Sequence, residues 1–205
     1  MPVTRPGEDM RVLLVLAHPK PDSFNAALLK EFVGGLVEAG HEPDVGDLYS
    51  EDFRPALGAE DLACMGAEAP DPAVRSYQAR ILAAQGLAFV FPVWWFGPPA
   101  MLKGFVDRVF QENFAFRFKE GGLVEGLLHH RRALVLNTTG ASALMYRTFG
   151  FGDPLRKSFC DWTLRFCGIK EVEQILFHEV VNTDDATRAA YLLEARWLGR
   201  EFFSA

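Results

Sequence analysis

Short runs of strand-forming residues, separated by segments of helical periodicity, most constrain the fold of this chain. Residues 11–17 and 133–137 are almost continuously apolar, which is typical of parallel strands covered on both faces. Residues 42–48, 87–91 and 172–177 are predicted to form the other strands. Because helices alternate with these strands, the pattern predicts an α/β protein with a doubly wound parallel sheet, in three layers and in the order 2-1-3-4-5.

Amphipathic helices are predicted between the strands. Apolar residues recur over 28–37 at the spacing of one helical face, and Gly40 is placed to end this helix. Residues 49–72 are rich in Gly, Pro, Ala and acidic side chains, and we interpret them as a long surface excursion. Further helices are predicted over residues 72–85, from Pro99 onward, over residues 155–166 and over residues 184–203.

Length and charge limit the class of the chain. A length of 205 residues suits one domain, so we expect a single domain over residues 1–205, with residues 1–10 as a disordered or extended N-terminus. The contents of 49% apolar and 23% charged residues are those of a soluble globular enzyme. A net charge of -6 opposes binding to nucleic acid, which requires clustered Lys and Arg. The basic pair Arg131-Arg132 is too short to change this, and we interpret it as a solvated turn.

The cysteines and the N-terminus indicate a cytoplasmic protein. Cys64, Cys160 and Cys167 are odd in number and lack C-x-x-C spacing, so neither a disulfide framework nor a metal site is predicted. Cys160 and Cys167 stand among apolar residues and are expected to be buried. No apolar run approaches the length of a membrane span and no export signal is recognised, so we expect no membrane insertion.

The loop after the first predicted strand is a candidate phosphate site. It reads His18-Pro19-Lys20-Pro21-Asp22-Ser23-Phe24-Asn25 and leads into a helix, whose free N–H groups and dipole favour an anion. It contains neither G-x-G-x-x-G nor G-x-x-x-x-G-K-[ST], which removes a standard dinucleotide fingerprint and a Walker-type ATPase. The simpler interpretation is that Ser23 or Asn25 only caps the helix and that His18 is structural.

A second loop carries three consecutive aromatic residues. Trp94, Trp95 and Phe96 follow the strand that reaches Pro92 and Val93, in the crevice where open α/β sheets bind ligands. Exposed rings are costly, so this loop indicates a planar aromatic cofactor that covers them. The alternative is a plug of aromatic side chains that belongs to the core.

The third loop is built from small residues. Thr138-Thr139-Gly140-Ala141 follows the fourth predicted strand, and Tyr146 and Gly150-Phe151-Gly152 come soon after it. Backbone N–H groups in such a segment approach a ligand closely and stabilise negative charge that develops on a ring during reduction. Taken alone, the segment is equally compatible with a flexible glycine-rich turn.

With these residues in view, the chain resembles the flavodoxin-like NAD(P)H:quinone oxidoreductases, the DT-diaphorase group and its bacterial relatives. The resemblance extends from about Arg11 to Phe203, and the combination of motifs is specific although each motif alone is weak. It agrees with the predicted strand order, which is the flavodoxin-like one. The matching segments are Val15-Leu16-Ala17-His18, Ser23-Phe24-Asn25, Phe91-Pro92, Trp95-Phe96-Gly97, Pro99-Ala100-Met101-Leu102-Lys103-Gly104, Arg108-Val109-Phe110, Thr138-Thr139-Gly140, Met145-Tyr146 and Phe166-Cys167-Gly168.

The resemblance implies a tightly bound flavin, NAD(P)H as co-substrate, and a homodimer with active sites at the subunit interface. It favours FAD, with FMN as the alternative, because Arg188 matches a family arginine near the far end of FAD. Tyr146 matches a tyrosine that is proposed to steady charge on the reduced flavin, and it is the candidate catalytic residue. The residues implied to hold the flavin are His18, Ser23, Phe24 and Asn25 at the phosphates, Pro92, Val93, Trp94, Trp95 and Phe96 along the ring, and Thr138, Thr139 and Gly140 at its polar edge.

The chain also departs from the family. Its best-known members carry a histidine in a Gly-x-His-Gly-Asp run after the tyrosine, whereas this chain has Gly150-Phe151-Gly152-Asp153. A proton relay from tyrosine to that histidine is therefore not expected here. Asn113 replaces a glutamate near the flavin, and residues 114–128 match poorly, so the identity of the substrate is not carried over.

We therefore predict an enzyme that passes a hydride from NAD(P)H, through bound flavin, to a quinone or a similar aromatic acceptor with ping-pong kinetics. Trp95, Phe96 and Phe151 are expected to form flat walls of the substrate pocket. Two alternatives remain open. One is a one-electron flavodoxin-type carrier, although Asp22-Ser23-Phe24-Asn25 lacks the clustered Thr and Gly usual there. The other is a flavin-binding regulatory subunit of a partner such as a potassium-efflux system.

Overall fold

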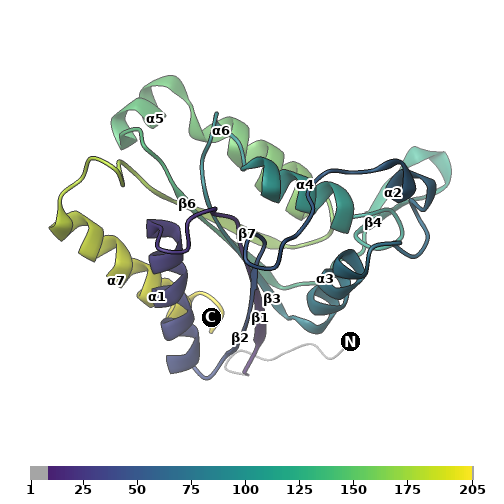
Figure 1. Cartoon of the computed structure of the whole chain (residues 1–205), viewed down its shortest axis with the longest axis horizontal. Coiled ribbons are helices and arrows are strands. Elements are labelled where there is room, and N and C mark those ends of the chain that lie inside the picture. Colours follow the sequence, from purple (N-terminus) through teal and green to yellow (C-terminus); the bar gives the residue numbers. More distant parts are fainter. Residues whose placement is uncertain (1–8, 205) are drawn as a thin grey trace.

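Five parallel strands form the central sheet of the computed structural model, which describes residues 9–204 (Figure 1). Their order is β2-β1-β3-β6-β7, which is the predicted order 2-1-3-4-5 when the strands of this sheet alone are counted. The α/β fold class and the strand order are thus confirmed. The expectation of a disordered or extended N-terminus concerned residues 1–10, of which residues 1–8 lie outside the described residues. The strands are β1 (Arg11–Leu16), β2 (Glu42–Asp47), β3 (Gly86–Pro92), β6 (Arg132–Thr138) and β7 (Glu171–Phe177).

Helices cover both faces of the sheet (Figure 1). The helices α1 and α7 lie side by side on one face, and α3, α4 and η2 cover the other. None of the helices in the described part of the chain is both long enough and apolar enough to cross a membrane. The helices are α1 (Phe24–Glu38), α2 (Ala59–Ala63), α3 (Pro72–Ala83), α4 (Ala100–Val109), α5 (Ala143–Phe149), α6 (Gly152–Leu155), α7 (Asp185–Glu201), the short 3-10 helix η1 (Glu120–Gly122) and the π-helix η2 (Arg156–Arg165).

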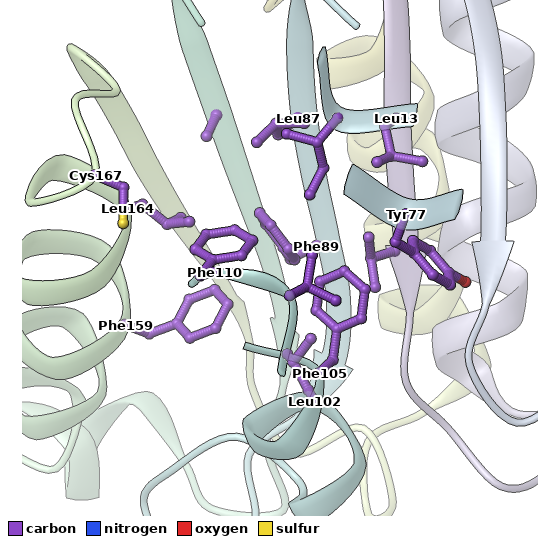
Figure 2. Packing of buried hydrophobic residues seen from close by; sticks show 14 of the residues in the cluster. Leu13, Tyr77, Leu87, Phe89, Leu102, Phe105, Phe110, Phe159, Leu164 and Cys167 are labelled. Atoms are coloured by element: carbon purple, nitrogen blue, oxygen red, sulfur yellow. The ribbon is translucent and has the colours of Figure 1, made fainter. Parts of the chain in front are cut away.

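Aromatic rings fill the core on the α3/α4/η2 face (Figure 2). Successive side chains of β3 point to opposite faces, so Phe89 and Phe91 enter this core while Ala88 and Val90 enter the other one. The rings of Phe89 and Phe159 meet edge to face with centroids 5.3 Å apart, an arrangement that aromatic quadrupoles favour. This rigid layer supports β3, the strand that leads into the aromatic loop.

On the opposite face, two glycines allow α1 and α7 to pack closely. A Cβ atom placed on Gly35 would lie 2.0 Å from the carbonyl oxygen of Arg196, and one on Gly199 would lie 2.1 Å from that of Phe32. Real Cβ atoms do not approach backbone this closely, so only glycine fits at either position. The two helices therefore pack backbone against backbone.

The segment 49–72 is more than the surface excursion that we predicted. Phe53 is buried in the core, and the segment contains the unpredicted helix α2. Arg108 of α4, itself buried, lies 3.0 Å from a carboxylate oxygen of Asp61 and 3.0 Å from one of Asp71. Hydrogen bonds from Arg108 lower the pKa of Asp61 and keep this carboxylate charged. The buried ion pair anchors a segment whose composition alone suggested a loop.

Three further elements differ from the predictions. The helix predicted over residues 155–166 begins as α6 and continues as the π-helix η2. Arg132 does not lie in a solvated turn but in β6, where it pairs with Glu171 at 2.6 Å, and His130 before it is buried. An antiparallel hairpin of β4 (Phe116–Phe118) and β5 (Val124–Gly126) was not predicted. Cys160 and Cys167 are buried as expected.

We expect the neighbouring glycines of α1 to respond in opposite ways to substitution by alanine. Gly35→Ala should lower the free energy of unfolding by about 1–3 kcal/mol, because its methyl group would push α7 away. Gly34→Ala meets only the flexible tip of Arg196 and should be neutral or stabilising by up to about 1 kcal/mol, since alanine favours a helix. Urea unfolding of both variants measures the difference, and equal stability of the two would contradict this close packing.

Candidate functional site

The three loops singled out in the sequence meet at the carboxyl edge of the sheet, because β1, β3 and β6 are neighbours. Backbone hydrogen bonds continue past the strand ends: Ala17 N–H donates to Val90 (3.0 Å), and Val93 N–H donates to Thr138 (2.8 Å). These bonds fix the start of each loop against the next. The edge is the place where open α/β sheets bind ligands.

The first loop presents the amino end of α1. Ser23 is the N-cap of this helix, and its Oγ accepts from the N–H of Ala26 at 3.2 Å, so Ser23 does cap the helix. Its hydroxyl proton stays available to donate. The N–H groups of Phe24 and Asn25 have no acceptor among the described residues. A helix that begins in this way is suited to bind an anion.

Asn25 joins the first loop to the third. Its Nδ2 donates to Oγ1 of Thr138 at 2.9 Å, and the side chain is buried. Its Oδ1 is also buried and finds no donor within the described residues. A buried acceptor without a partner is costly, and a ligand hydroxyl or N–H group would satisfy it.

His18 lies beside the aromatic loop. Its Nδ1 lies 3.0 Å from the backbone nitrogen of Lys20 and 3.3 Å from the carbonyl oxygen of the same residue. The ring centroid lies 6.2 Å from that of Trp94. His18 thus lies between the first two loops, where its ring can donate an N–H group to a ligand.

The aromatic loop is a tight turn that exposes its rings. Trp94 and Gly97 exchange two backbone hydrogen bonds of 3.1 Å, with Trp95 and Phe96 between them. Trp95 is 95% exposed and Phe96 43% exposed, so the alternative of an aromatic plug in the core is wrong. Rings with this exposure can pack against another flat group.

The backbone of this turn is strained. Trp95 and Phe96 have φ values of +51° and +60°, which a type I′ turn requires and which Asn and Gly usually supply. Bulky residues in this conformation cost about 1–2 kcal/mol each. Since strain of this kind concentrates at ligand-binding sites, the residue types at these two positions point to a role in binding.

The third loop offers unpaired backbone donors. Thr138 and Thr139 are buried, and Thr139 N–H donates to Phe177 of the neighbouring strand β7 at 2.9 Å. The N–H groups of Gly140 and Ala141 have no acceptor in residues 9–204. A Cβ atom on Gly140 would meet nothing within 4 Å, so the space above it is open.

Tyr146 stands beside this loop on α5, which Ser142 caps by accepting from the N–H of Met145 at 3.2 Å. The ring is buried, and burial raises the pKa of its phenol, a change that the Thr139 side chain partly offsets. Tyr146 therefore stays protonated at neutral pH as a hydrogen-bond donor. A cavity of about 420 Å³ opens next to it, lined by Ala143, Tyr146, Arg147, Gly150, Gly152, Asp153, Leu176 and His178.

The structure brings together part of the predicted substrate pocket. The rings of Phe96 and Phe151 lie with centroids 4.6 Å apart, and Phe151 stacks on Phe149 with an interplanar angle of 18°. Trp95 makes no ring contact within the described residues and extends into solvent. Two of the three predicted pocket residues therefore meet, across the second and third loops.

Arg188 lies apart from the three loops, at the start of α7. Its Nε and Nη2 donate to the carbonyl groups of Val180 and Val181 at 3.2 Å, and its Nη1 donates to Asp185 at 2.9 Å. Arg188 thus orders the loop after β7, and Val180 N–H in turn donates to Thr139 at 3.1 Å. A ligand role for Arg188 stays a prediction.

His178 was missed by the sequence analysis. It follows β7 directly, and its ring packs edge to face on Tyr146 with centroids 4.9 Å apart. The sequence contained a usable signal, because His178 comes directly after the end of the last predicted strand. In the described part of the chain, no three His, Cys, Asp or Glu side chains form a group that could hold a metal ion.

The architecture and these loops define an α/β protein with its binding edge at the carboxyl ends of the strands. Residues 10–198 match the family model described as flavodoxin-like fold, and the chain belongs to this family.

Two relatives and one solved structure are similar to the chain over most of its length. The chain is 32% identical over 184 residues to an uncharacterized NAD(P)H oxidoreductase of Haemophilus influenzae, an alignment that covers 89% of this chain and 91% of the relative. It is 34% identical over 219 residues to the mouse (Mus musculus) ribosyldihydronicotinamide dehydrogenase [quinone], with 93% and 90% covered. Among solved structures, the NAD(P)H:quinone oxidoreductase from Methanothermobacter marburgensis is 32% identical, with a TM-score of 0.88 and coverage of 95% of this chain and 100% of that one.

We expect the residues of the aromatic turn to favour ligand binding while lowering the free energy of unfolding. Replacing Trp95-Phe96 by Asn-Gly should raise the free energy of unfolding by about 1–3 kcal/mol, because both new residues adopt the left-handed backbone at low cost. The same change should reduce the retention of a flat ligand such as flavin. Urea unfolding and ligand content are measured on the same samples. Trp162→Ala, another exposed tryptophan far from this turn in sequence, is the control and should not raise stability. A double variant that is no more stable than the parent would contradict the claim that the turn is strained.

Proposed function

We propose that this protein is a flavin-dependent NAD(P)H oxidoreductase that reduces a quinone or a similar aromatic acceptor. The observation that carries the proposal is the strained turn of Trp95 and Phe96, which keeps two exposed rings in the loop at the binding edge. The names of the relatives, which include an NAD(P)H oxidoreductase and two quinone-reducing enzymes, support the same class of reaction.

The residues at the edge suit a flavin. The unpaired Oδ1 of Asn25 can accept from a hydroxyl group, and the free N–H groups of Gly140 and Ala141 can donate to ring carbonyl groups. His18 and the amino end of α1 supply donors for phosphate. The proposed flavin site comprises His18, Ser23, Phe24, Asn25, Pro92, Val93, Trp94, Trp95, Phe96, Thr138, Thr139, Gly140, Ala141 and Tyr146.

When bound, a flavin supplies the capacity to accept a hydride and to pass it on. The protein contributes orientation and a common pocket in which NAD(P)H and the acceptor bind in turn, so ping-pong kinetics are expected. Phe96 and Phe151 form flat walls, against which an aromatic acceptor stacks. Tyr146, kept protonated by burial, donates a hydrogen bond to negative charge that develops beside it.

FAD is proposed in preference to FMN. Arg188 is about one third exposed, and each of its terminal nitrogens uses only one N–H in the observed contacts, so donors remain for a second phosphate or an adenosine. Chromatography of the flavin released by heat distinguishes the two cofactors, and recovery of FMN alone would overturn this preference.

A cytoplasmic homodimer is also proposed. Trp162 is 70% exposed, and Phe118 of β4 is 61% exposed. The half-buried Phe116 packs on Phe166 with centroids 5.4 Å apart, which continues the apolar surface toward η2. Apolar surface of this kind is typical of a subunit interface. Sedimentation at several concentrations tests it, and a monomer at every concentration would contradict it.

We expect the purified protein to show flavin absorbance bands that bleach when NADPH is added without oxygen and that return when a quinone is added. The expected return of the bands without any partner protein separates this function from that of a one-electron carrier. A colourless protein that takes up neither FAD nor FMN would overturn the proposal.

Tyr146→Phe should lower turnover by roughly 10²-fold, because the variant lacks the proton donor at the edge of the site. It should leave flavin content nearly unchanged, since the ring keeps its packing on Phe151 and His178. Turnover and the dissociation constant of the flavin are measured in parallel. Phe149→Leu, which alters a neighbouring exposed ring, serves as the control. Equal losses of turnover and flavin binding would contradict the assigned role.

A further inference from the structure

The proposed reaction consumes one proton in addition to the hydride. NAD(P)H, a proton and a quinone give NAD(P)⁺ and a hydroquinone, and the hydride carries only one of the two hydrogens that the quinone gains. The family histidine after the tyrosine is absent, and Phe151 stands in this region. The second proton therefore comes from water or from another group of this chain.

His178 is the histidine that the fold brings to Tyr146. It belongs to the end of β7, whereas Tyr146 belongs to α5, and both line the cavity of about 420 Å³. Its ring lies edge to face with that of Tyr146, and its backbone carbonyl accepts from the hydroxyl of Tyr191 at 3.2 Å. The backbone of His178 is thus held by Tyr191, and its ring packs against Tyr146.

The hydrogen bonds around His178 select its tautomer. Oγ1 of Thr139 donates its only proton to the carbonyl of Ala141 at 2.7 Å, so at His178 Nδ1, 3.3 Å away, this oxygen acts as an acceptor. Nδ1 therefore carries the proton of the neutral ring, and Nε2 holds the free lone pair. Nε2 makes no hydrogen bond within residues 9–204.

The surroundings keep the imidazole neutral before reduction. Burial lowers the pKa of His178, and the charge of Arg147 on α5 lowers it further. The carbonyl of Ala141 and the carboxylate of Glu179 oppose this shift. Asp153 at the start of α6 and the phenol of Tyr146 also line the cavity. A neutral base beside a place where negative charge develops gains a proton there, because the new charge raises its pKa.

We propose that Nε2 of His178 stores the proton that the reaction consumes. In the first half-reaction the hydride adds one negative charge to the site, and Nε2 takes a proton from water. In the second half-reaction the acceptor receives the hydride, Tyr146 donates its Oη proton to the oxygen of the acceptor, and the proton on Nε2 restores the phenol through the cavity that both side chains line. This proposal rests on the proposed function, and it assigns the proton to a histidine at the end of β7.

Proton uptake during reduction tests the proposal. Flavin-loaded enzyme in weak buffer at about pH 7.5, where the neutral imidazole predominates, is mixed without oxygen with equimolar NADPH and a pH indicator. The parent should take up a proton as the flavin bleaches, and His178→Gln should lose this uptake. The variant should also reduce the acceptor roughly 10²-fold more slowly while its flavin bleaches at the parent rate. His129→Gln, an exposed histidine at the other end of β6, should behave as the parent.

The possible results distinguish a failure of the proposed role of His178 from a failure of the proposed oxidoreductase function. If flavin bleaches and returns normally but His178→Gln takes up the same proton, the proposed function stands and the role of His178 is overturned. If NADPH does not bleach the protein at all, both are overturned. If His178→Gln takes up no proton and only its acceptor step slows, the role of His178 is supported.

A measurement on the unaltered enzyme covers the case in which His178→Gln does not retain flavin. The chain has five histidines, whose ring nitrogens are followed in NMR spectra of ¹⁵N-labelled protein. The titration midpoint of one histidine should rise on reduction, and its signal should persist when His41, His129 and His130 are replaced one at a time. A nuclear Overhauser contact with the ring of Tyr146 distinguishes this histidine from His18. If no midpoint rises, the proposal is overturned.

Discussion

The hydrogen bonds that continue the parallel ladder beyond the strand ends determine the geometry of the whole site. Ala17 to Val90, Val93 to Thr138 and Thr139 to Phe177 tie four neighbouring strands together at the point where each turns into a loop. The donors of α1, the aromatic turn and the third loop depend on these contacts for their mutual placement. Without this common edge, the same residues would not lie close enough to form one site. None of the three loops alone identifies the ligand.

The binding edge rests on a tightly packed aromatic core, but it also contains two energetically unfavourable features. The rings of Phe89 and Phe159 hold β3 from below, while the turn above it keeps Trp95 and Phe96 in a left-handed backbone. The unpaired Oδ1 of Asn25 adds a second unfavourable feature at the same edge. A ligand donor would satisfy this oxygen, and contacts between a ligand and the two rings would offset the strain of the turn, so binding is expected to stabilise the protein.

The sequence was sufficient to predict the strands of the central sheet, their order and the three loops, because buried parallel strands and amphipathic helices have distinct periodicities. It was not sufficient where long-range pairing decides. The role of segment 49–72 depends on Arg108, which lies far along the chain, and its composition resembles that of a loop. The contact between Tyr146 and His178 depends on how α5 lies against the end of β7, and no local pattern shows this although the predicted strand order places β6 beside β7.

The buried ion pairs of Arg108 with Asp61 and Asp71 make the stability of the segment around α2 depend on pH. Asp61 has a lowered pKa, so its contribution to stability is complete at neutral pH and is lost as the pH falls through that lowered value. Protonation leaves a buried guanidinium with one carboxylate partner fewer, which is costly. In acid, therefore, the segment around α2 is the region expected to detach first, while the apolar sheet beneath it persists as a folded remnant.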